Sequence, residues 1–449
     1  MVILFVLAGI AALAALAGMQ WYAWRRLVRD TTAGPGFARR AGTVVFVAGP
    51  LLMFAAVASE RTGAPFWLQQ VLAWPGFMWM ALSIYLVLAL LVAELVRPFF
   101  LRRRTNPTPT EDSATEGSPT EDPATEGSPT EDPATERSST ESPAPEALST
   151  ESPAPQAPAP APAPAPAEVR TERATPSRRL FVSRIVGGTA AAVAVGTVGQ
   201  GTYGVLRGPR VKRVTVPLAK LPRGAHGFRI AVVSDVHLGP ILGRGFTQRV
   251  VDTINGTQPD LIAVVGDLVD GSVEDLAPAA APLAQLRARH GTYFVTGNHE
   301  YFSGAEQWVD HVRELGLRPL ENARTELPGF DLAGVDDVAG EREGRGPDFA
   351  KALGDRDRSR ASVLLAHQPV VIHDAVKHGV DLQLSGHTHG GQLWPGNFIA
   401  DLANPTLAGL ERYGDTQLYV TRGAGAWGPP VRVGAPSDIT VVELASRQA

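Results

Sequence analysis

Five short motifs place carboxylates, histidines and one asparagine in the second half of the chain. They are Asp235-Val236-His237, Gly266-Asp267, Gly297-Asn298-His299, a lone His367 and Gly386-His387-Thr388-His389. Carboxylate, amide and imidazole ligands without sulfur suit Mn²⁺, Fe or Zn²⁺. Two such cations about 4 Å apart neutralise a phosphate and activate a bridging water as the nucleophile. The residue types therefore indicate two-metal phosphoester chemistry.

Each motif follows a short run that is typical of a buried β-strand. The runs are Arg229–Ser234, Leu261–Val265, Tyr293–Thr296, Ser362–Ala366 and Leu382–Ser385. Helical stretches are expected between some of them, at Gly245–Asn255, Pro278–Arg289 and Ala305–Glu314. Sheets of α/β proteins place their sites just past the carboxyl ends of the strands. We therefore expect an α/β fold, a two-sheet sandwich with outer helices and the chemical residues at the sheet ends.

The motifs in full read SDVHLG, GDLVDG, GNHEY, LLAHQP and SGHTHGGQ. In this order they resemble the calcineurin-like metallophosphoesterase superfamily, and within it the membrane-anchored or twin-arginine-exported bacterial phosphoesterases. The resemblance covers the C-terminal half and implies a four-layer form of the sandwich. It implies a first metal held by Asp235, His237 and His389, a bridging Asp267, and a second metal held by Asn298, His367 and His387.

The resemblance also implies roles beside the metals. His299 would bind phosphate and protonate the leaving oxygen, which suits a side chain that titrates near neutral pH. Asp270 is either an acceptor that orients a metal ligand or an exposed turn residue. For Glu300 and Tyr301 two orientations are open: the side chains face the substrate, or they point away from it. Gly271 stands where the protein phosphatases of this superfamily carry an arginine, so protein phosphatase activity is not expected.

Composition narrows the range of partners. The chain of 449 residues carries a net charge of −4 and contains no cysteine. Disulfides, thiolate metal sites and a cysteine nucleophile are thereby excluded. The C-terminal domain has no basic stripe with interleaved aromatic residues, so no nucleic-acid partner is expected.

Residues 1–104 are predicted to be a membrane region. Three apolar stretches, Val2–Trp24, Ala41–Ser59 and Val71–Val96, approach or exceed the ~20 residues that span a bilayer. Arginines gather between the first two stretches and after the third, at positions 25, 26, 29, 39, 40, 97 and 102–104. The excess of positive charge in cytoplasmic loops then places the N-terminus outside and the end of the third span inside.

Residues 105–176 are predicted to be a disordered linker. A ten-residue Thr-Glu-Asp-Pro-Ala-Thr-Glu-Gly-Ser-Pro unit begins at Thr120, and Ala-Pro alternation follows between Ala154 and Ala167. Such a composition buries too little apolar area to offset the entropy of ordering.

Residues 177–209 are predicted to be a second export element. Ser177-Arg178-Arg179-Leu180-Phe181-Val182 resembles a twin-arginine signal, and a weakly apolar run, Ile185–Leu206, follows it. The alternative is a fourth transmembrane helix. A retained anchor is favoured, and both interpretations place the metallophosphoesterase domain, residues 210–449, outside the cytoplasm.

The leading hypothesis is a dinuclear metal-dependent phosphohydrolase in the cell membrane, multi-pass, with an extracytoplasmic catalytic domain. Its substrate would contain a phosphodiester or pyrophosphate bond and, because of the anchor, could be lipid-linked. One alternative is a tethered phosphomonoesterase or nucleotide scavenger. Another, from a different class, is a catalytically silent envelope binding protein. The complete ligand set argues against the silent protein.

Overall fold

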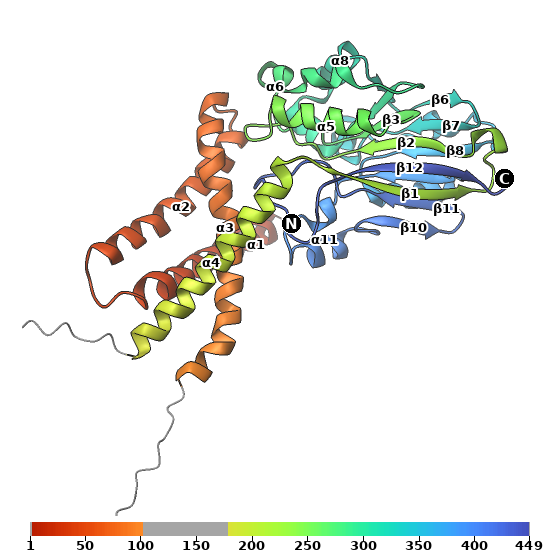
Figure 1. Cartoon of the computed structure of the whole chain (residues 1–449). Coiled ribbons are helices and arrows are strands. Elements are labelled where there is room, and N and C mark those ends of the chain that lie inside the picture. The colour runs from red at the N-terminus through yellow and green to blue at the C-terminus, as the bar shows by residue number, and fades with distance from the viewer. Residues whose placement is uncertain (1, 102–177, 449) are drawn as a thin grey trace, which may run out of the picture. The chain divides into compact units, whose positions relative to one another are not determined.

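The computed structural model describes residues 2–101 and 178–448. The linker predicted over residues 105–176, and its disorder, lie outside the described residues. The described helices and sheets belong to one structural unit, and Figure 1 shows their arrangement.

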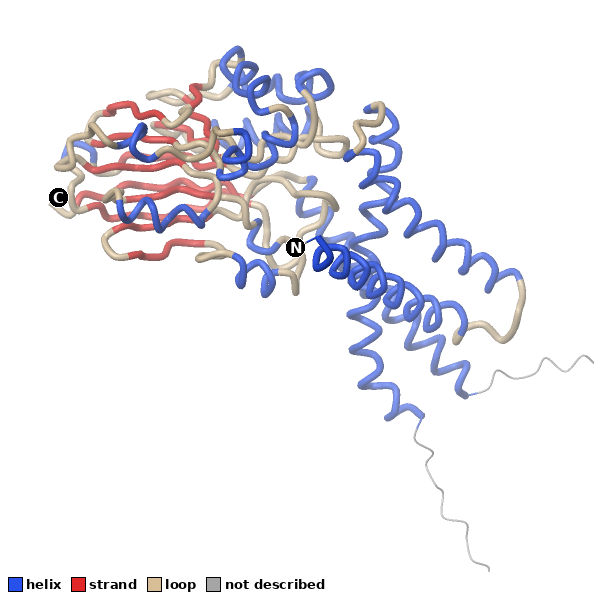
Figure 2. The backbone as a smooth tube through the Cα atoms, turned by 180° about the vertical axis from the view of Figure 1, so that it is seen from behind, coloured by secondary structure: helices blue, strands red, loops and turns tan. Residues whose placement is uncertain are grey.

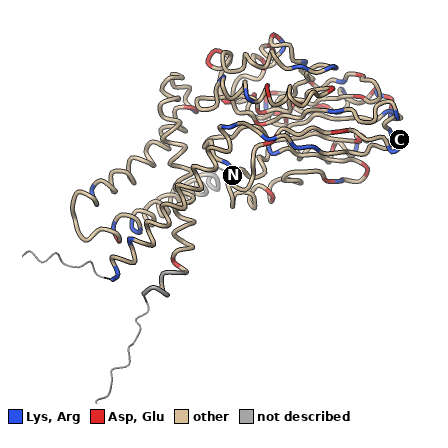
Figure 3. The backbone as a smooth tube through the Cα atoms, in the orientation of Figure 1, with Lys and Arg blue, Asp and Glu red and all other residues tan. Residues whose placement is uncertain are grey.

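Long helices form wherever the sequence predicts an apolar segment. They are α1 (Val2–Trp24), α2 (Phe37–Arg61), α3 (Phe66–Leu101) and α4 (Arg178–Leu206). By length and composition, three stretches among the described residues can cross a membrane: α2, residues Phe66–Leu95 of α3, and α4. Figure 3 shows how few charges these helices carry along their length. The chain is therefore a membrane protein.

Small residues let these helices approach one another and the C-terminal domain closely. Gly49 of α2 leaves no room for a Cβ against Trp79 of α3, and Gly76 lies against the backbone of Leu52. Gly201 of α4 lies in the same way against the backbone of Arg432. Close backbone approach at small residues is how helices pack where lipid removes the hydrophobic driving force.

Two six-stranded sheets form the C-terminal domain (Figure 2). The first contains, in spatial order, β1 (Arg210–Leu218), β12 (Asp438–Ser446), β2 (Phe228–Val233), β3 (Leu261–Val265), β4 (Thr292–Val295) and β5 (Arg318–Pro319). The second contains β10 (Gly409–Tyr413), β11 (Thr416–Val420), β9 (Leu382–Ser385), β8 (Ala361–Leu365), β7 (Phe330–Gly334) and β6 (Ala323–Leu327).

Helices cover the outer faces of the two sheets. Beside the first sheet lie α5 (Arg244–Gly256), α6 (Val273–Ala280) and α8 (Ala305–Glu314), and beside the second lie α9 (Phe349–Leu353) and α10 (Ile372–Lys377). The short helix α7 (Asn298–Ser303) follows β4 at the strand end. A further short helix, α11 (Asn397–Ala403), follows the last histidine motif.

Three hydrophobic cores separate the four layers. Along β2, Ala231 and Val233 pack toward the outer helices, while Ile230 and Val232 pack toward the second sheet. This alternation follows from the two-residue period of a strand. A third core joins the second sheet to α9 and α10. The prediction of a four-layer, two-sheet α/β sandwich after apolar helices is confirmed.

One predicted helix is wrong in its bounds. Pro278–Arg289 is not a single helix, because α6 begins earlier, at Val273, and a 3-10 turn (Ala281–Gln285) follows it. Ser272 caps α6 by accepting a hydrogen bond from the Asp275 amide, and two acidic residues stand in the first turn. Pro282, the second residue of the 3-10 turn, cannot donate a hydrogen bond into a continuing α-helix. The cap and this proline set the bounds.

Parallel strands bring the five motifs to one edge of the sandwich. In the first sheet β2, β3 and β4 are parallel neighbours, and in the second β8 and β9 are. The motif residues follow these five strands directly. The carboxyl ends of both sheets therefore supply one site.

Candidate metal centre

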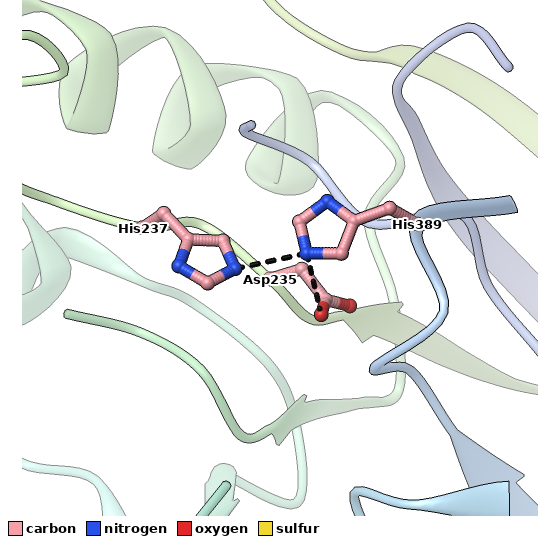
Figure 4. A group of neighbouring side chains, drawn as sticks. All are labelled: Asp235, His237 and His389. Carbon is pink, nitrogen blue, oxygen red and sulfur yellow. Dashed lines mark hydrogen bonds and ion pairs between the residues drawn. The ribbon is translucent and has the colours of Figure 1, made fainter. Parts of the chain in front are cut away.

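Three side chains from two sheets form the first group (Figure 4). Asp235 and His237 follow β2, and His389 follows β9. The two Nε2 atoms of His237 and His389 are 2.9 Å apart, and Asp235 Oδ1 lies 3.3 Å from His389 Nε2. All three residues are buried and could hold a metal ion.

Asp267, His367 and His387 form a second group of the same kind. Asp267 Oδ2 lies 3.1 Å from His367 Nε2 and 3.8 Å from His237 Nε2, which belongs to the first group. The Asp267 carboxylate thus stands between the two groups, where a shared ligand would stand.

Hydrogen bonds fix which imidazole nitrogen faces the centre. His367 Nδ1 lies 2.9 Å from the carbonyl oxygen of Val265, and His237 Nδ1 lies 3.0 Å from Asp270 Oδ1. Both Nε2 atoms are thereby directed inward. A carbonyl or carboxylate behind a histidine is the usual way to orient a metal-binding imidazole, so Asp270 has the orienting geometry and is not merely an exposed turn residue.

Among the buried polar atoms that lack a hydrogen-bond partner in the described part of the chain, one belongs to this centre: Asn298 Oδ1. Burying such an atom unpaired costs roughly 1–3 kcal/mol, so its presence calls for an explanation. A bound cation would provide one, because the amide oxygen carries a lone pair suited to coordination. The residues present therefore fit a metal site.

The backbone at the centre is strained. Asp235, His237, Asp267, His387 and His389 all have positive φ angles, between 49° and 72°. Non-glycine residues rarely adopt this region, and such strain concentrates at functional sites. The surrounding sheets hold these five residues in conformations that aim their side chains at one point.

The charges of Asp267 and His367 stabilise each other. Burial alone would raise the pKa of Asp267, but His367 and His237 outweigh it and lower that pKa. Burial alone would lower the pKa of His367, but Asp267 and Asp235 hold it well above its ordinary value. Without a cation, a proton on His367 therefore balances the Asp267 carboxylate.

The two histidines of the last motif behave differently. Burial and the charge on His367 lower the pKa of His387 to about 4. Burial, together with His237 and Arg432, lowers the pKa of His389 well below its ordinary value. Both rings are neutral at pH 7, which is the state that binds a metal ion.

His299 lies beside the first group, where it forms a further cluster with His237 and Asp270, and it is partly exposed. Its Nδ1 lies 2.6 Å from Asp270 Oδ1, and its Nε2 lies 4.0 Å from Asp267 Oδ2. Burial would lower the pKa of His299, but the hydrogen bond and charge of Asp270 raise it to about 9. Phe302 and Trp427 each place a ring centroid 5.6 Å from the imidazole. His299 therefore carries a proton at the mouth of the centre.

The structure excludes one of the two expectations for Glu300. Its side chain is fully buried and accepts hydrogen bonds from the amides of Gly297 (2.6 Å), Leu268 (2.7 Å) and Asp267 (3.0 Å). Burial and the charge of Asp267 raise the pKa of Glu300 to about 7. The residue ties two strand-end loops together and does not face a substrate. Tyr301 is partly exposed and lines a hollow beside the centre.

The sequence assigned no role to Arg432, although this arginine and the segment Gly423–Gly428 resemble the C-terminal pattern of the exported phosphoesterases. It is buried, and its guanidinium donates to the carbonyl oxygens of His389 (3.0 Å), Gly425 (2.6 Å) and Ala435 (3.2 Å). Arg432 thus connects the loop after β11 to the motif Gly386-His387-Thr388-His389. The sequence could not supply this role, because the partners of Arg432 are backbone carbonyl oxygens, those of His389 and Gly425 among them.

This fold and site define a metal-dependent phosphoesterase. A profile of the family described as "Calcineurin-like phosphoesterase" matches residues 228–391, the span that contains all five motifs. The chain belongs to this family.

Several curated proteins resemble the C-terminal half. A "Transmembrane protein with metallophosphoesterase domain" from Danio rerio is 39% identical over 250 residues, which cover 53% of this chain and 57% of that protein. An "Uncharacterized metallophosphoesterase" from Aquifex aeolicus is 36% identical, covering 52% and 91%. The "Uncharacterized metallophosphoesterase YkuE" of Bacillus subtilis is 30% identical, covering 60% and 98%. The match thus spans little more than half of the Danio rerio protein.

Proposed function

We propose that the protein hydrolyses a phosphodiester or pyrophosphate bond with a pair of divalent cations, at the outer face of the cytoplasmic membrane. The observation that carries this proposal is the place of Asp267, whose Oδ2 lies within 4 Å of a histidine from each of the two groups. One carboxylate so placed can serve two cations.

We assign the ligands as the motifs suggest. Asp235, His237 and His389 hold one cation; Asn298, His367 and His387 hold the other; Asp267 is shared. The mixed oxygen and nitrogen donors favour Mn²⁺, Fe or Zn²⁺. When bound, such a pair neutralises the phosphate charge and makes water a nucleophile at neutral pH.

His299 supplies the proton in this proposal. Asp270 accepts a hydrogen bond from His299 Nδ1, so His299 Nε2 carries the proton that a departing oxygen needs. A pKa near 9 keeps that proton in place at pH 7 in the metal-free protein. Phe302 and Trp427 flank the ring and restrict its rotation.

The placement in the membrane is part of the proposal. We divide the chain into a membrane region (1–104), a linker (105–176), an anchor or twin-arginine signal (177–209) and the catalytic domain (210–449). Arg26 and Arg184 support this topology, because they bind Glu94 and the Thr31 carbonyl at the helix ends away from the catalytic domain.

A tethered phosphomonoesterase remains the alternative, and substrate choice separates the two. The purified full-length chain in detergent with Mn²⁺ should hydrolyse bis(para-nitrophenyl) phosphate faster than para-nitrophenyl phosphate. The opposite preference would establish the monoesterase. A chain that binds metal but hydrolyses neither would support a catalytically silent binding protein.

A further inference from the structure

An apolar groove runs between two of the long helices. It has a volume of about 550 Å³ and is lined by α3 from Tyr85 to Ala93, by α4 from Ile185 to Thr197, and by Trp394 and Val433 of the catalytic domain. Alanines at four of these positions keep the helices from filling it. The walls are almost entirely apolar, with hydroxyl groups only on Tyr85, Thr189 and Thr197.

The groove has the dimensions and surroundings of a lipid-chain site. From Ile185 to Thr197 an α-helix rises about 18 Å, close to the ~15 Å depth of hydrocarbon in one leaflet. Both helical walls belong to segments apolar enough to cross a membrane. Hydrocarbon chains are therefore the solvent that a groove at this depth would meet.

One end of the groove connects to the metal centre through a short protein segment. The Tyr85 hydroxyl donates to the carbonyl oxygen of Trp394 (2.9 Å), and Trp394 lies five residues beyond His389. Between them, the Gln392 side chain donates to the carbonyl oxygen of Trp427 (2.9 Å) and accepts from its amide (3.0 Å). The Trp427 ring then faces His299. Half-exposed indoles thus stand at the groove end and at the mouth of the centre.

The membrane region also supplies charges of both signs at that mouth, from Arg61 and from Glu60, which interacts with Asp270 and His299. The exposed Arg61, at the end of α2, places its guanidinium carbon 5.9 Å from the centroid of the Phe302 ring, which packs on His299. A cation beside the proton donor attracts an anionic head group. The apolar groove, the two half-exposed indoles and the Arg61 cation follow one another in the order of an amphiphile's chain and phosphate.

We infer that the substrate is a membrane lipid with a phosphodiester head group, whose acyl chain occupies the groove between α3 and α4 while its phosphate reaches the metal centre. This inference rests on the proposed phosphodiester hydrolysis and names the substrate class. The groove holds the chain, Trp394 marks the level of the interface, and Arg61 meets the head group.

Two valines on α4 provide a matched test. Val193 lines the groove and is 54% exposed, whereas Val195, 59% exposed, does not line it. Two substrates share one scissile bond: diacylglycerol para-nitrophenyl phosphodiesters with palmitoyl or with butanoyl chains, presented to the full-length chain in mixed micelles with Mn²⁺. The measured quantity is the ratio of kcat/KM for the long-chain over the short-chain substrate.

Val193→Trp should lower this ratio about tenfold, because the indole would occupy groove volume that the palmitoyl chain needs. Val195→Trp should leave it unchanged. Equal ratios in both variants and the wild type would overturn the inference. If the wild type hydrolyses neither diester, the proposed function itself fails, which is a different result.

A binding measurement tests the occupant without turnover. A phosphatidylcholine with a diazirine on its acyl chain, irradiated with the full-length chain in vesicles, should label peptides that line the groove, and Val193→Trp should reduce that labelling. Because the chain has no cysteine, Val193→Cys carries a unique thiol. Efficient disulfide dimers through that thiol, with no lipid labelling, would show a second copy in the groove and would overturn the inference.

Discussion

At the scale of single residues, proton position decides the chemistry of this site. Asp270 lies behind both His237 and His299, so one carboxylate orients a candidate metal ligand and the candidate acid together. The pKa of Asp270 falls to about 2 because the two imidazoles outweigh its burial. It therefore stays ionised wherever the enzyme works.

Replacing His299 should separate proton transfer from metal binding. His299→Ala should keep both cations and lower turnover by about 10²–10⁴-fold, the usual contribution of a positioned acid. The loss should be larger for alkoxide leaving groups than for nitrophenolate, which departs without a proton. His373→Ala, outside every motif, is the control. Loss of a metal, or equal slowing on both leaving groups, would make His299 a ligand or a phosphate anchor.

Metal uptake should release protons. His367 is protonated at pH 7 in the metal-free protein, because Asp267 raises its pKa well above the ordinary value. A cation at His367 Nε2 must displace that proton, so apparent affinity should rise with pH. Calorimetric titration with Mn²⁺ at pH 7 in two buffers of different protonation enthalpy measures the release. Identical heats in both buffers would remove His367 from the proposed ligands.

At the scale of secondary-structure elements, the positions of the strands were the most predictable part of the fold. β3 and β9 have the predicted bounds, and β2, β4 and β8 differ by one residue, because short buried apolar runs leave little choice. The motifs after these strands come together as expected, although their roles as ligands stay predictions. The structural roles of Arg432 and the buried Glu300 could not be predicted, since they depend on backbone groups that the fold brings together.

The turn after β4 depends on a glycine. A Cβ on Gly297 would collide with the Asp267 carboxylate and approach within 2.9 Å of His367 Cδ2. Gly297→Ala should therefore displace Asp267 and weaken metal binding at least tenfold. Gly245→Ala, on the surface of α5 with no near neighbour except Arg249, is the control. Unchanged metal content by elemental analysis in Gly297→Ala would show that this turn does not position the carboxylate.

At the scale of the whole molecule, the apolar helices and the catalytic domain form one structural unit. Their contacts, such as Gly201 on the backbone of Arg432, involve residues that no sequence pattern connects. The sequence predicted each part but not their junction, because junctions depend on shape and not on periodicity.

Topology can be measured directly. Reporters active only after export, fused after Gly208 and within Ala154–Ala167, should be active and inactive respectively, as the arginine distribution predicts. Arg178→Lys combined with Arg179→Lys should block export if the segment is a twin-arginine signal. The reverse reporter pattern would place the catalytic domain in the cytoplasm, and unchanged export would leave α4 an ordinary membrane span.

The central claim is that two cations share Asp267 in a phosphodiesterase. The most direct measurement titrates the metal-free, full-length chain with Mn²⁺ while following hydrolysis of bis(para-nitrophenyl) phosphate. It compares the wild type, Asp267→Asn and the control Asp260→Asn, whose residue directly precedes β3. Wild type and control should reach full activity at two equivalents, whereas Asp267→Asn should bind both weakly and lose activity by at least ~10²-fold. Full activity at one equivalent, or near-normal turnover and metal content in Asp267→Asn, would contradict the dinuclear assignment.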